Sequence, residues 1–137
     1  VTIAPSAHYP VTKGTLRECT GAGVILIQDH QIQGGMVELP DRDPRTALGY
    51  TSKNVVWILT VDGRHGTLGM TYGEMASLFK SLDCEAAVNL DGGGSTQLFM
   101  INPQTGRIGV QNWLSDPHLG FGGRERPRLN AWYITRK

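Results

Sequence analysis

The chain has 137 residues, 39% of them hydrophobic, and a formal net charge of +1, which together indicate one globular domain with a genuine core. The balanced charge and the lack of a long basic stripe exclude duplex nucleic acid as an expected partner. No apolar run approaches the roughly 20 residues that span a bilayer. The chain begins at Val1 rather than Met, so any secretory signal would already have been removed. We expect an extracytoplasmic or secreted location.

The first predicted elements are strands. Residues 22–28 form an apolar run, and Asp29-His30 turns the chain into a second short run at 31–33. A segment rich in Pro and Asp precedes another strand that begins at residues 45–50. The two cysteines, Cys19 and Cys84, either pair or remain reduced, and the sequence leaves both alternatives open.

A strand and a helix follow. Residues 55–61 are almost continuously apolar, which is typical of a strand buried on both faces. A helix is predicted over about residues 72–82, since apolar side chains recur at the helical spacing from Met75 onward. Thr71 and Glu74 have the spacing of a capping box at its start.

A second apolar strand, residues 86–90, completes a predicted βαβ unit over about residues 55–91. The two strands of such a unit normally run parallel. Asp62 and Asp91, which end these strands, would then emerge at one edge of the sheet. Open α/β sheets bind their ligands at that edge.

The rest of the chain predicts more strand than helix. Residues 97–101 and 107–110 flank a turn and predict a hairpin. The stretch 115–127 predicts a long loop, a candidate lid, and residues 129–134 a last strand. The predicted fold is a strand-rich single domain over residues 1–137, of the α+β or mixed α/β class.

Three consecutive glycines follow the second strand of the unit. Gly92, Gly93 and Gly94 allow positive φ and close approach of a ligand, so their N–H groups could line an anion-binding concavity. Ser95 and Thr96 add hydroxyl groups to it. The structural alternative is a plain tight turn between strands.

Five short motifs resemble, in this order and spacing, the phosphodiester glycosidase family. They are Arg45-Thr46-Ala47-Leu48-Gly49, Val61-Asp62-Gly63-Arg64, Gly69-Met70-Thr71 with Glu74 and Ala76, Asn89-Leu90-Asp91-Gly92-Gly93-Gly94-Ser95-Thr96, and Glu125-Arg126-Pro127 with Asn130-Ala131. The resemblance covers about residues 45–134. It implies hydrolysis of a sugar-1-phosphodiester at the glycosidic carbon, which releases the sugar and leaves a phosphomonoester.

The N-terminal part of the chain departs from this family. Members carry a further segment with an Asn-Gly-Gly-Phe-like motif, and nothing here matches it. We therefore expect the chain to lack the N-terminal part of the family's domain. Either a missing segment or a companion chain would then complete the pocket.

The chemistry requires a carboxylate at an oxocarbenium-like centre and donors that hold the departing phosphate. Asp91 is the first candidate for the nucleophile or base, Asp62 the second and Glu74 the third. A phosphate diester is already a good leaving group, so one acid could suffice. Each acid has a structural alternative, namely an Asx-turn cap for Asp91, a hairpin turn for Asp62 and the capping box for Glu74.

Arginines are the candidate phosphate clamps, because a planar guanidinium can hold two phosphate oxygens at once. The candidates are Arg45, Arg64 and Arg126, and a surface charge is the alternative for each. Asn89 interrupts an apolar strand, so it could bond a sugar hydroxyl or a neighbouring acid, or be a buried structural residue. His65 is expected to be a solvated loop residue.

No cofactor is expected, and the histidines have no metal-binding spacing. Oxygen ligands such as those of Asp62, Asp91 and Glu74 suit Mg²⁺ or Ca²⁺, so a divalent cation at this site stays an open alternative. A second hypothesis for the whole chain is a non-catalytic module that binds phosphorylated or envelope glycans. It would use the same glycine loop and arginines.

Overall fold

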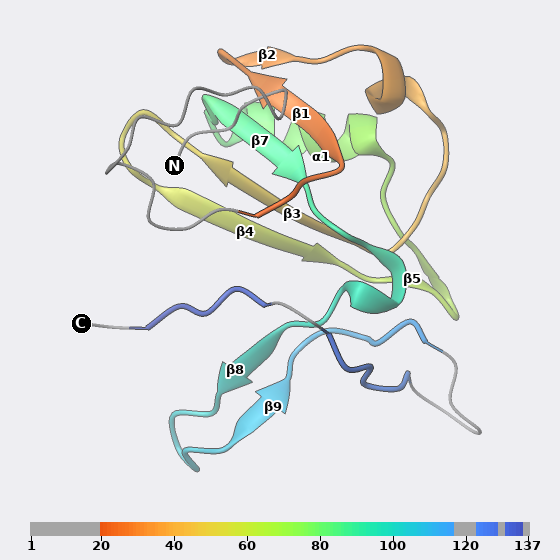
Figure 1. The fold of residues 1–137 in the computed structure, drawn as a ribbon, viewed down its shortest axis with the longest axis vertical. Helices are drawn as coiled ribbons and strands as arrows, with labels where there is room; N and C mark the ends of the chain where they lie inside the picture. Colours follow the sequence, from red (N-terminus) through yellow and green to blue (C-terminus); the bar gives the residue numbers. More distant parts are fainter. Residues whose placement is uncertain (1–19, 117–122, 129–130, 136–137) are drawn as a thin grey trace.

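A computed structural model describes residues 20–116, 123–128 and 131–135 of the chain (Figure 1). The elements are β1 (Val24–Gln28), β2 (Gln31–Ile32), η1 (Gly35–Glu38, a 3-10 turn), β3 (Arg45–Tyr50), β4 (Val56–Val61), β5 (Gly63–Arg64), β6 (Thr67–Leu68), α1 (Tyr72–Ser81), β7 (Ala86–Asn89), η2 (Gly93–Ser95, a 3-10 turn), β8 (Phe99–Ile101) and β9 (Ile108–Val110). This is a strand-rich α+β arrangement with one α-helix in the described residues, in agreement with the predicted class.

The central sheet has the order β2-β1-β7-β3-β4, and each neighbouring pair is antiparallel. β4 and β7 are both antiparallel to β3, so they run in the same direction, as the predicted βαβ unit requires. They are not neighbours, because β3 lies between them. The chain forms the β3–β4 pair locally, through a turn that begins at Thr51, and β7 then pairs with the free edge of β3 after the helix.

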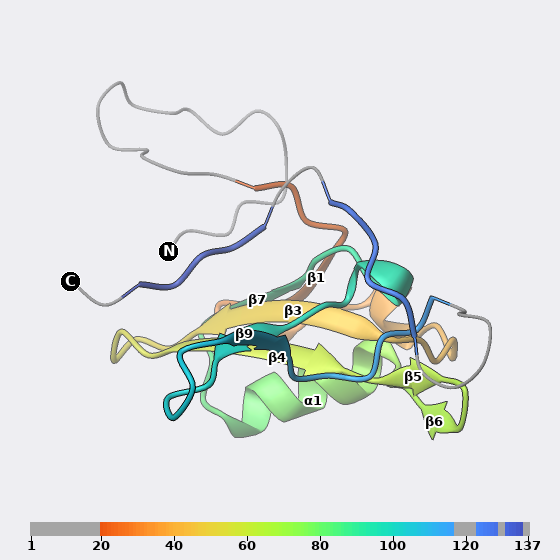
Figure 2. The ribbon, with the colours of Figure 1, turned by 90° about the horizontal axis from the view of Figure 1, so that it is seen from below.

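Helix α1 covers one face of this sheet (Figure 2). Its predicted capping box is present, since the Thr71 hydroxyl accepts the Glu74 N–H and the Glu74 carboxylate accepts the Thr71 N–H. Phe79 is fully buried in the core between helix and sheet, and burial of such a side chain contributes about 1.5–3 kcal/mol. Gly49 of β3 makes room for it, since a Cβ there would lie 2.7 Å from the Phe79 ring.

Strand β4 corrects one prediction. Its apolar run indicated burial on both faces, but Val56, Trp57 and Ile58 are 48%, 41% and 39% exposed. β4 is an edge strand of the described sheet and has only β3 beside it. A continuous apolar run does not reveal whether a second strand or a covering layer lies against it.

The predicted hairpin is confirmed, with Met100 opposite Gly109 in the β8–β9 pair. The predicted last strand is wrong for residues 131–134, which form no strand, and residues 129–130 lie outside the described residues. Residues 117–122 of the candidate lid also lie outside them. Cys84 is buried in the core, whereas Cys19 falls outside the described residues, so the alternative of a disulfide stays open.

Candidate functional site

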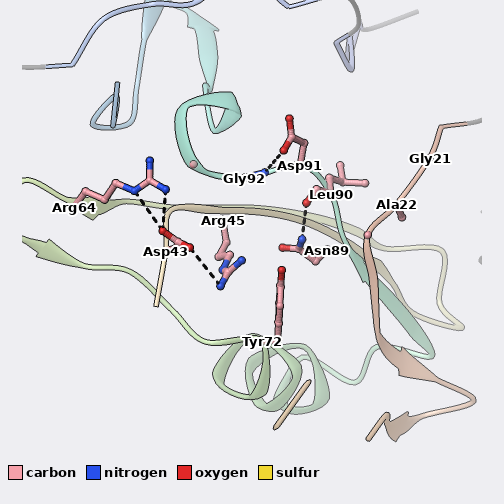
Figure 3. A pocket seen from close by; sticks show the side chains of 12 residues that line it. Gly21, Ala22, Asp43, Arg45, Arg64, Tyr72, Asn89, Leu90, Asp91 and Gly92 are labelled. Atoms are coloured by element: carbon pink, nitrogen blue, oxygen red, sulfur yellow. Dashed lines mark hydrogen bonds and ion pairs between the residues drawn. The ribbon is translucent and has the colours of Figure 1, made fainter. Parts of the chain in front are cut away.

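A cavity of about 590 Å³ opens at the edge of the sheet where β7 ends and where β1 and β3 begin (Figure 3). Residues from five segments far apart in the sequence line it. They are Gly21, Ala22, Gly23, Asp43, Arg45, Arg64, Tyr72, Asn89, Leu90, Asp91, Gly92 and Gly93. The sequence-predicted residues Arg45, Arg64, Asn89, Asp91, Gly92 and Gly93 are therefore brought together.

Arg45 is the buried cation of this cavity, with only 7% of its surface exposed. Its Nε donates to the Met70 carbonyl at 3.2 Å and its Nη2 to the Asp41 carbonyl at 2.9 Å. The Tyr72 ring lies under the guanidinium, 4.1 Å from its Cζ. The nearest carboxylate oxygen, Oδ2 of Asp43, is 4.0 Å away. Because neutral carbonyls supply its hydrogen bonds, this buried positive charge is only weakly neutralised.

Arg64 is the second cation and lies at the rim, with half of its side chain exposed. Its Nε and Nη2 donate to Oδ1 of Asp43 at 3.3 and 3.0 Å. Its backbone has φ of 65°, in the left-handed region, where a residue with a Cβ is held at a cost of about 1–2 kcal/mol. The guanidinium lies against Gly93, since a Cβ on Gly93 would be 3.4 Å from Nη2.

Asn89 is 4% exposed and lies at the end of β7, where its side chain faces the cavity. Its Nδ2 donates to the Leu90 carbonyl, and its Oδ1 has no hydrogen-bond partner among the described residues. In Figure 3 this oxygen points toward Arg45 and Tyr72. Buried polar atoms are almost always paired, so this acceptor in the cavity wall is available to a water molecule or to a bound molecule.

Asp91 lies at the exposed rim of the cavity. Its Oδ1 accepts the Gly92 N–H at 2.9 Å, and its Oδ2 accepts the Ser95 hydroxyl. The Ser95 hydrogen bond is the main reason why the pKa of Asp91 is lowered, and the Gly92 N–H and the charges of Arg128 and Arg126 add to it against the opposing effect of burial. The cap named as the structural alternative is therefore present, and it also holds the carboxylate in its ionised form.

Most N–H groups of the glycine loop, residues 92–96, are bound within the protein and do not line the predicted concavity. The Gly93 N–H donates to Pro44, the Ser95 N–H to Gly92 and the Thr96 N–H to Gly93, while the Gly92 N–H is bound to Asp91. Packing requires the glycines instead. A Cβ on Gly92 would lie 2.7 Å from the Pro44 carbonyl oxygen, and Gly93 has φ of +58°. The prediction of an anion site is wrong for these four N–H groups.

The other residues of the loop also have internal partners. Gly94 is buried, and a Cβ on it would collide with Asp116. Thr96 is 1% exposed, and its hydroxyl accepts a hydrogen bond from the Thr46 hydroxyl at 3.2 Å. These residues shape the turn behind the cavity and do not line it.

Asp62 and Glu74 lie outside the cavity lining. Oδ1 of Asp62 accepts the Trp113 N–H at 2.9 Å and the Asn112 amide at 3.2 Å, so it ties the segment after β9 to the end of β4. The Glu74 carboxylate caps α1 and pairs with Arg42. The backbone N–H of Thr71 is the first cause of the lowered pKa of Glu74, followed, against burial, by Arg42. Glu74 has the structural role that the sequence offered as its alternative, whereas Asp62 is not a hairpin-turn residue.

Arg126 and His65 are also placed elsewhere. Arg126 forms an ion pair with Asp116 at 3.1 Å and lines a second cavity of about 460 Å³. Its charge still acts on Asp91, whose pKa it lowers. His65 lies with its Nε2 3.1 Å from the Ser115 carbonyl oxygen.

Sequence reasoning missed Asp43 and Tyr72. Asp43 lies two residues before the start of β3. Because β3 is antiparallel to β4 and β7, its start lies where they end. Tyr72 opens α1 at the same edge, and its ring supports Arg45. The predicted strand at residues 45–50 could have revealed Asp43. If that strand had been placed between the two predicted parallel strands, Asp43 would have been a candidate site residue.

The described residues contain no group of three or more His, Cys, Asp or Glu side chains that could hold a metal ion. Asp62 and Asp91, the pair considered for a divalent cation, do not line the same cavity. In the part of the chain that the structure describes, no helix combines the length and apolar character that a bilayer crossing needs.

Comparisons with known proteins agree with the motifs. The SPbeta prophage-derived uncharacterized protein YomE of Bacillus subtilis (strain 168) is 37% identical over 96 residues, which cover 66% of this chain and 15% of that protein. N-acetylglucosamine-1-phosphodiester alpha-N-acetylglucosaminidase of Bos taurus is 41% identical over 58 residues, covering 42% of this chain and 11% of that enzyme. The matches thus span only a small part of these curated relatives.

Among solved structures, the catalytic domain of zebrafish N-acetylglucosamine-1-phosphodiester alpha-N-acetylglucosaminidase, auto-inhibited by its pro-peptide, superposes with a TM-score of 0.55. The match has 21% identity and covers 70% of this chain and 34% of that one, and at this identity it shows the fold alone. The family model described as phosphodiester glycosidase matches residues 2–135, further toward the N-terminus than the sequence motifs reach. With nearly its whole length inside that model, the chain belongs to the phosphodiester glycosidase family.

Proposed function

We propose that the cavity binds a sugar-1-phosphodiester and hydrolyses its glycosidic bond, which releases the sugar and leaves a phosphomonoester. The observation that carries this proposal is Arg45, a buried guanidinium that lines the cavity and donates its hydrogen bonds to neutral carbonyls. A ligand that brings a negative charge to it would offset the cost of burying that cation.

The charges of the cavity suit a phosphodiester. Arg45 and Arg64 supply two guanidinium groups, with the Asp43 carboxylate between them and the Asp91 carboxylate at the rim. The two guanidinium groups are the cationic donors that can face the negative oxygens of a phosphodiester group. Guanidinium groups also hold two phosphate oxygens at once, which fixes the orientation of the group as well as its position.

Asp91 is the proposed reacting carboxylate. Its lowered pKa keeps it ionised near neutral pH, which suits a nucleophile or a base and not a general acid. Protonation of the leaving group is not needed, because the phosphomonoester departs as a stable anion. Attack at the anomeric carbon, or activation of a water molecule that attacks it, is therefore the step assigned to Asp91.

Turnover of a defined substrate tests this proposal. The chain is incubated with the methyl phosphodiester of an α-linked or β-linked sugar-1-phosphate, and free reducing sugar is measured. Asp91→Asn should abolish release, whereas Asp83→Asn should not. Asp83 is an exposed control with φ of 58°, a conformation that Asn tolerates. Equal release by both variants would refute the role of Asp91.

The same assay separates the two functions that the sequence allowed. Binding of the diester without any release of sugar would favour the non-catalytic glycan-binding module. Activity of the chain alone would also show that the expected N-terminal part or companion chain is not needed. An extracytoplasmic location stays a prediction.

A further inference from the structure

The amide of Asn89 has one orientation that its neighbours allow. One N–H of Nδ2 donates to the Leu90 carbonyl, and the reverse assignment of the amide would set two oxygens against each other. Oδ1 is buried in the cavity wall and has no partner among the described residues. This atom can accept a hydrogen bond but cannot donate one.

A lone acceptor selects the part of the ligand that can meet it. The non-bridging oxygens of a phosphodiester are acceptors and would be repelled by Oδ1. A sugar hydroxyl or an amide N–H of an acylamino sugar is a donor and would satisfy it. The Oδ1 atom of Asn89 therefore favours the sugar over the phosphate at its end of the cavity.

Arg64 lies away from this acceptor. In Figure 3, Arg64 and Asn89 are on opposite sides of Arg45 and Asp43, and Asp91 lies above Asn89 in this view. Tyr72 lines the Asn89 end, and its hydroxyl points toward the amide. The cavity thus has a phosphate-binding end at Arg64 and a sugar-binding end at Asn89.

On the basis of the proposed function, we propose that Asn89 Oδ1 accepts a hydrogen bond from one donor group of the sugar and thereby fixes the direction in which the substrate lies. The sugar occupies the Asn89 end and its phosphate extends toward Arg64. The anomeric carbon, which joins the two, then lies at the level of Asp91.

Calorimetric binding with a series of sugar-1-phosphate methyl diesters tests this. Each hydroxyl in turn is replaced by fluorine, which cannot donate, and a 2-acetamido group is replaced by 2-acetoxy. One replacement should weaken binding to the native chain by about 10- to 100-fold. A penalty at a fluorinated position identifies a hydroxyl as the donor, and a penalty at the acetoxy ligand identifies the amide.

Asn89→Leu, which is similar in size but cannot accept, should bind the parent ligand weakly and show no penalty at that position. Arg64→Ala should weaken binding of every diester while the penalty persists in full. The assignment of Asn89 Oδ1 as the acceptor would be overturned in either of two cases. Arg64→Ala could bind the parent ligand and the sensitive analogue equally well, or Asn89→Leu could still bind the sensitive analogue more weakly than the parent.

A measurement on the native chain covers the case in which Asn89→Leu does not fold. The ¹³Cγ resonance of Asn89 should shift with the parent diester and stay unmoved with the sensitive analogue. An unmoved resonance with the bound parent would overturn the inference while leaving hydrolysis intact. Failure of every diester to bind would instead overturn the proposed function, and the inference with it.

Discussion

Oδ1 of Asp43 lies 3.0 Å from Nη2 of Arg64 and also accepts a hydrogen bond from its Nε. The other oxygen of the same carboxylate is 4.0 Å from Arg45. One acid therefore stands between the two cations of the cavity and orients the mobile one of the pair. Its contribution to the fold is small, because exposed ion pairs contribute about 0–1 kcal/mol.

Substitution of Asp43 should change substrate binding more than the chemical step. Asp43→Asn removes the charge that orients Arg64, so we expect KM to rise by about 3- to 10-fold with kcat little changed. Asp41→Asn is the matched control, since Asp41 is exposed and contacts Arg45 through its main-chain carbonyl. A collapse of kcat at constant KM in Asp43→Asn would identify Asp43 as the reacting acid instead of Asp91.

Arg64→Ala should weaken diester binding directly. Loss of a charge-assisted contact to phosphate costs about 1.5–3 kcal/mol, a rise in Kd of roughly 10- to 100-fold. Arg107→Ala is the control, because this exposed arginine lies on the β8–β9 hairpin, outside the cavity lining. Titration calorimetry with a methyl phosphodiester measures both, and similar losses would mean that binding follows net charge alone.

The Asp91 carboxylate predicts an unusual pH profile. Its pKa is lowered chiefly by the Ser95 hydroxyl, so the ionised form should persist below the pH at which an ordinary aspartate is protonated. Asp91→Asn should reduce kcat by about 10³-fold or more. In Ser95→Ala the pKa rises, so the acidic limb of kcat/KM should move to higher pH. A limb that does not move would show that another group controls it.

Comparing alanine variants of two glycines distinguishes the effect of backbone strain from the effect of a contact with Arg64. Gly93→Ala and Gly106→Ala both place a Cβ on a left-handed residue, at φ of 58° and 68°. Each should lose about 1–2 kcal/mol of stability in urea titrations. Only Gly93→Ala should also weaken diester binding, since its Cβ would contact the Arg64 guanidinium at 3.4 Å on the side where Gly93 lines the cavity, whereas a Cβ on Gly106 meets nothing within 4 Å. If both variants bind the diester equally well, Gly93 is needed only for the turn and not for the ligand.

Glu74 should affect stability and not turnover. Its pKa is lowered in the fold, so the stability it contributes is present above its unfolded pKa and is lost as the pH falls through the folded one. Glu74→Gln should therefore have a lower Tm near neutral pH and a smaller loss of Tm on acidification. Thermal unfolding from pH 7 to 3 measures this, and a loss of kcat in Glu74→Gln would restore its catalytic candidacy.

Much of the fold was predictable because its signals are local. The capping box at Thr71 and Glu74, the turn at Asp29 and the hairpin at 97–110 each depend on a few adjacent residues. The insertion of β3 between β4 and β7 depends on which strand edges remain free, and no short pattern encodes it. The exposure of β4 was missed for the same reason.

The site was predicted in part for a related reason. Asn89 and Asp91 follow from the end of one apolar strand, and their position did not depend on its neighbours. Asp62 was placed beside them only by assuming adjacent parallel strands. With β3 in between, Asp43 and Arg45 occupy that place, and Asp62 bonds to Asn112 instead.

Strand β7 lies between β1 and β3, so both of its edges are paired. Withdrawing it would break two ladders at once, and Asn89 is therefore held as firmly as the sheet itself. Arg64, by contrast, belongs to a hairpin of two-residue strands. The proposed sugar end of the cavity thus rests on a strand paired along both edges, and the proposed phosphate end rests on a short hairpin. We therefore expect strict discrimination between sugars and tolerance toward the group on the far side of the phosphate.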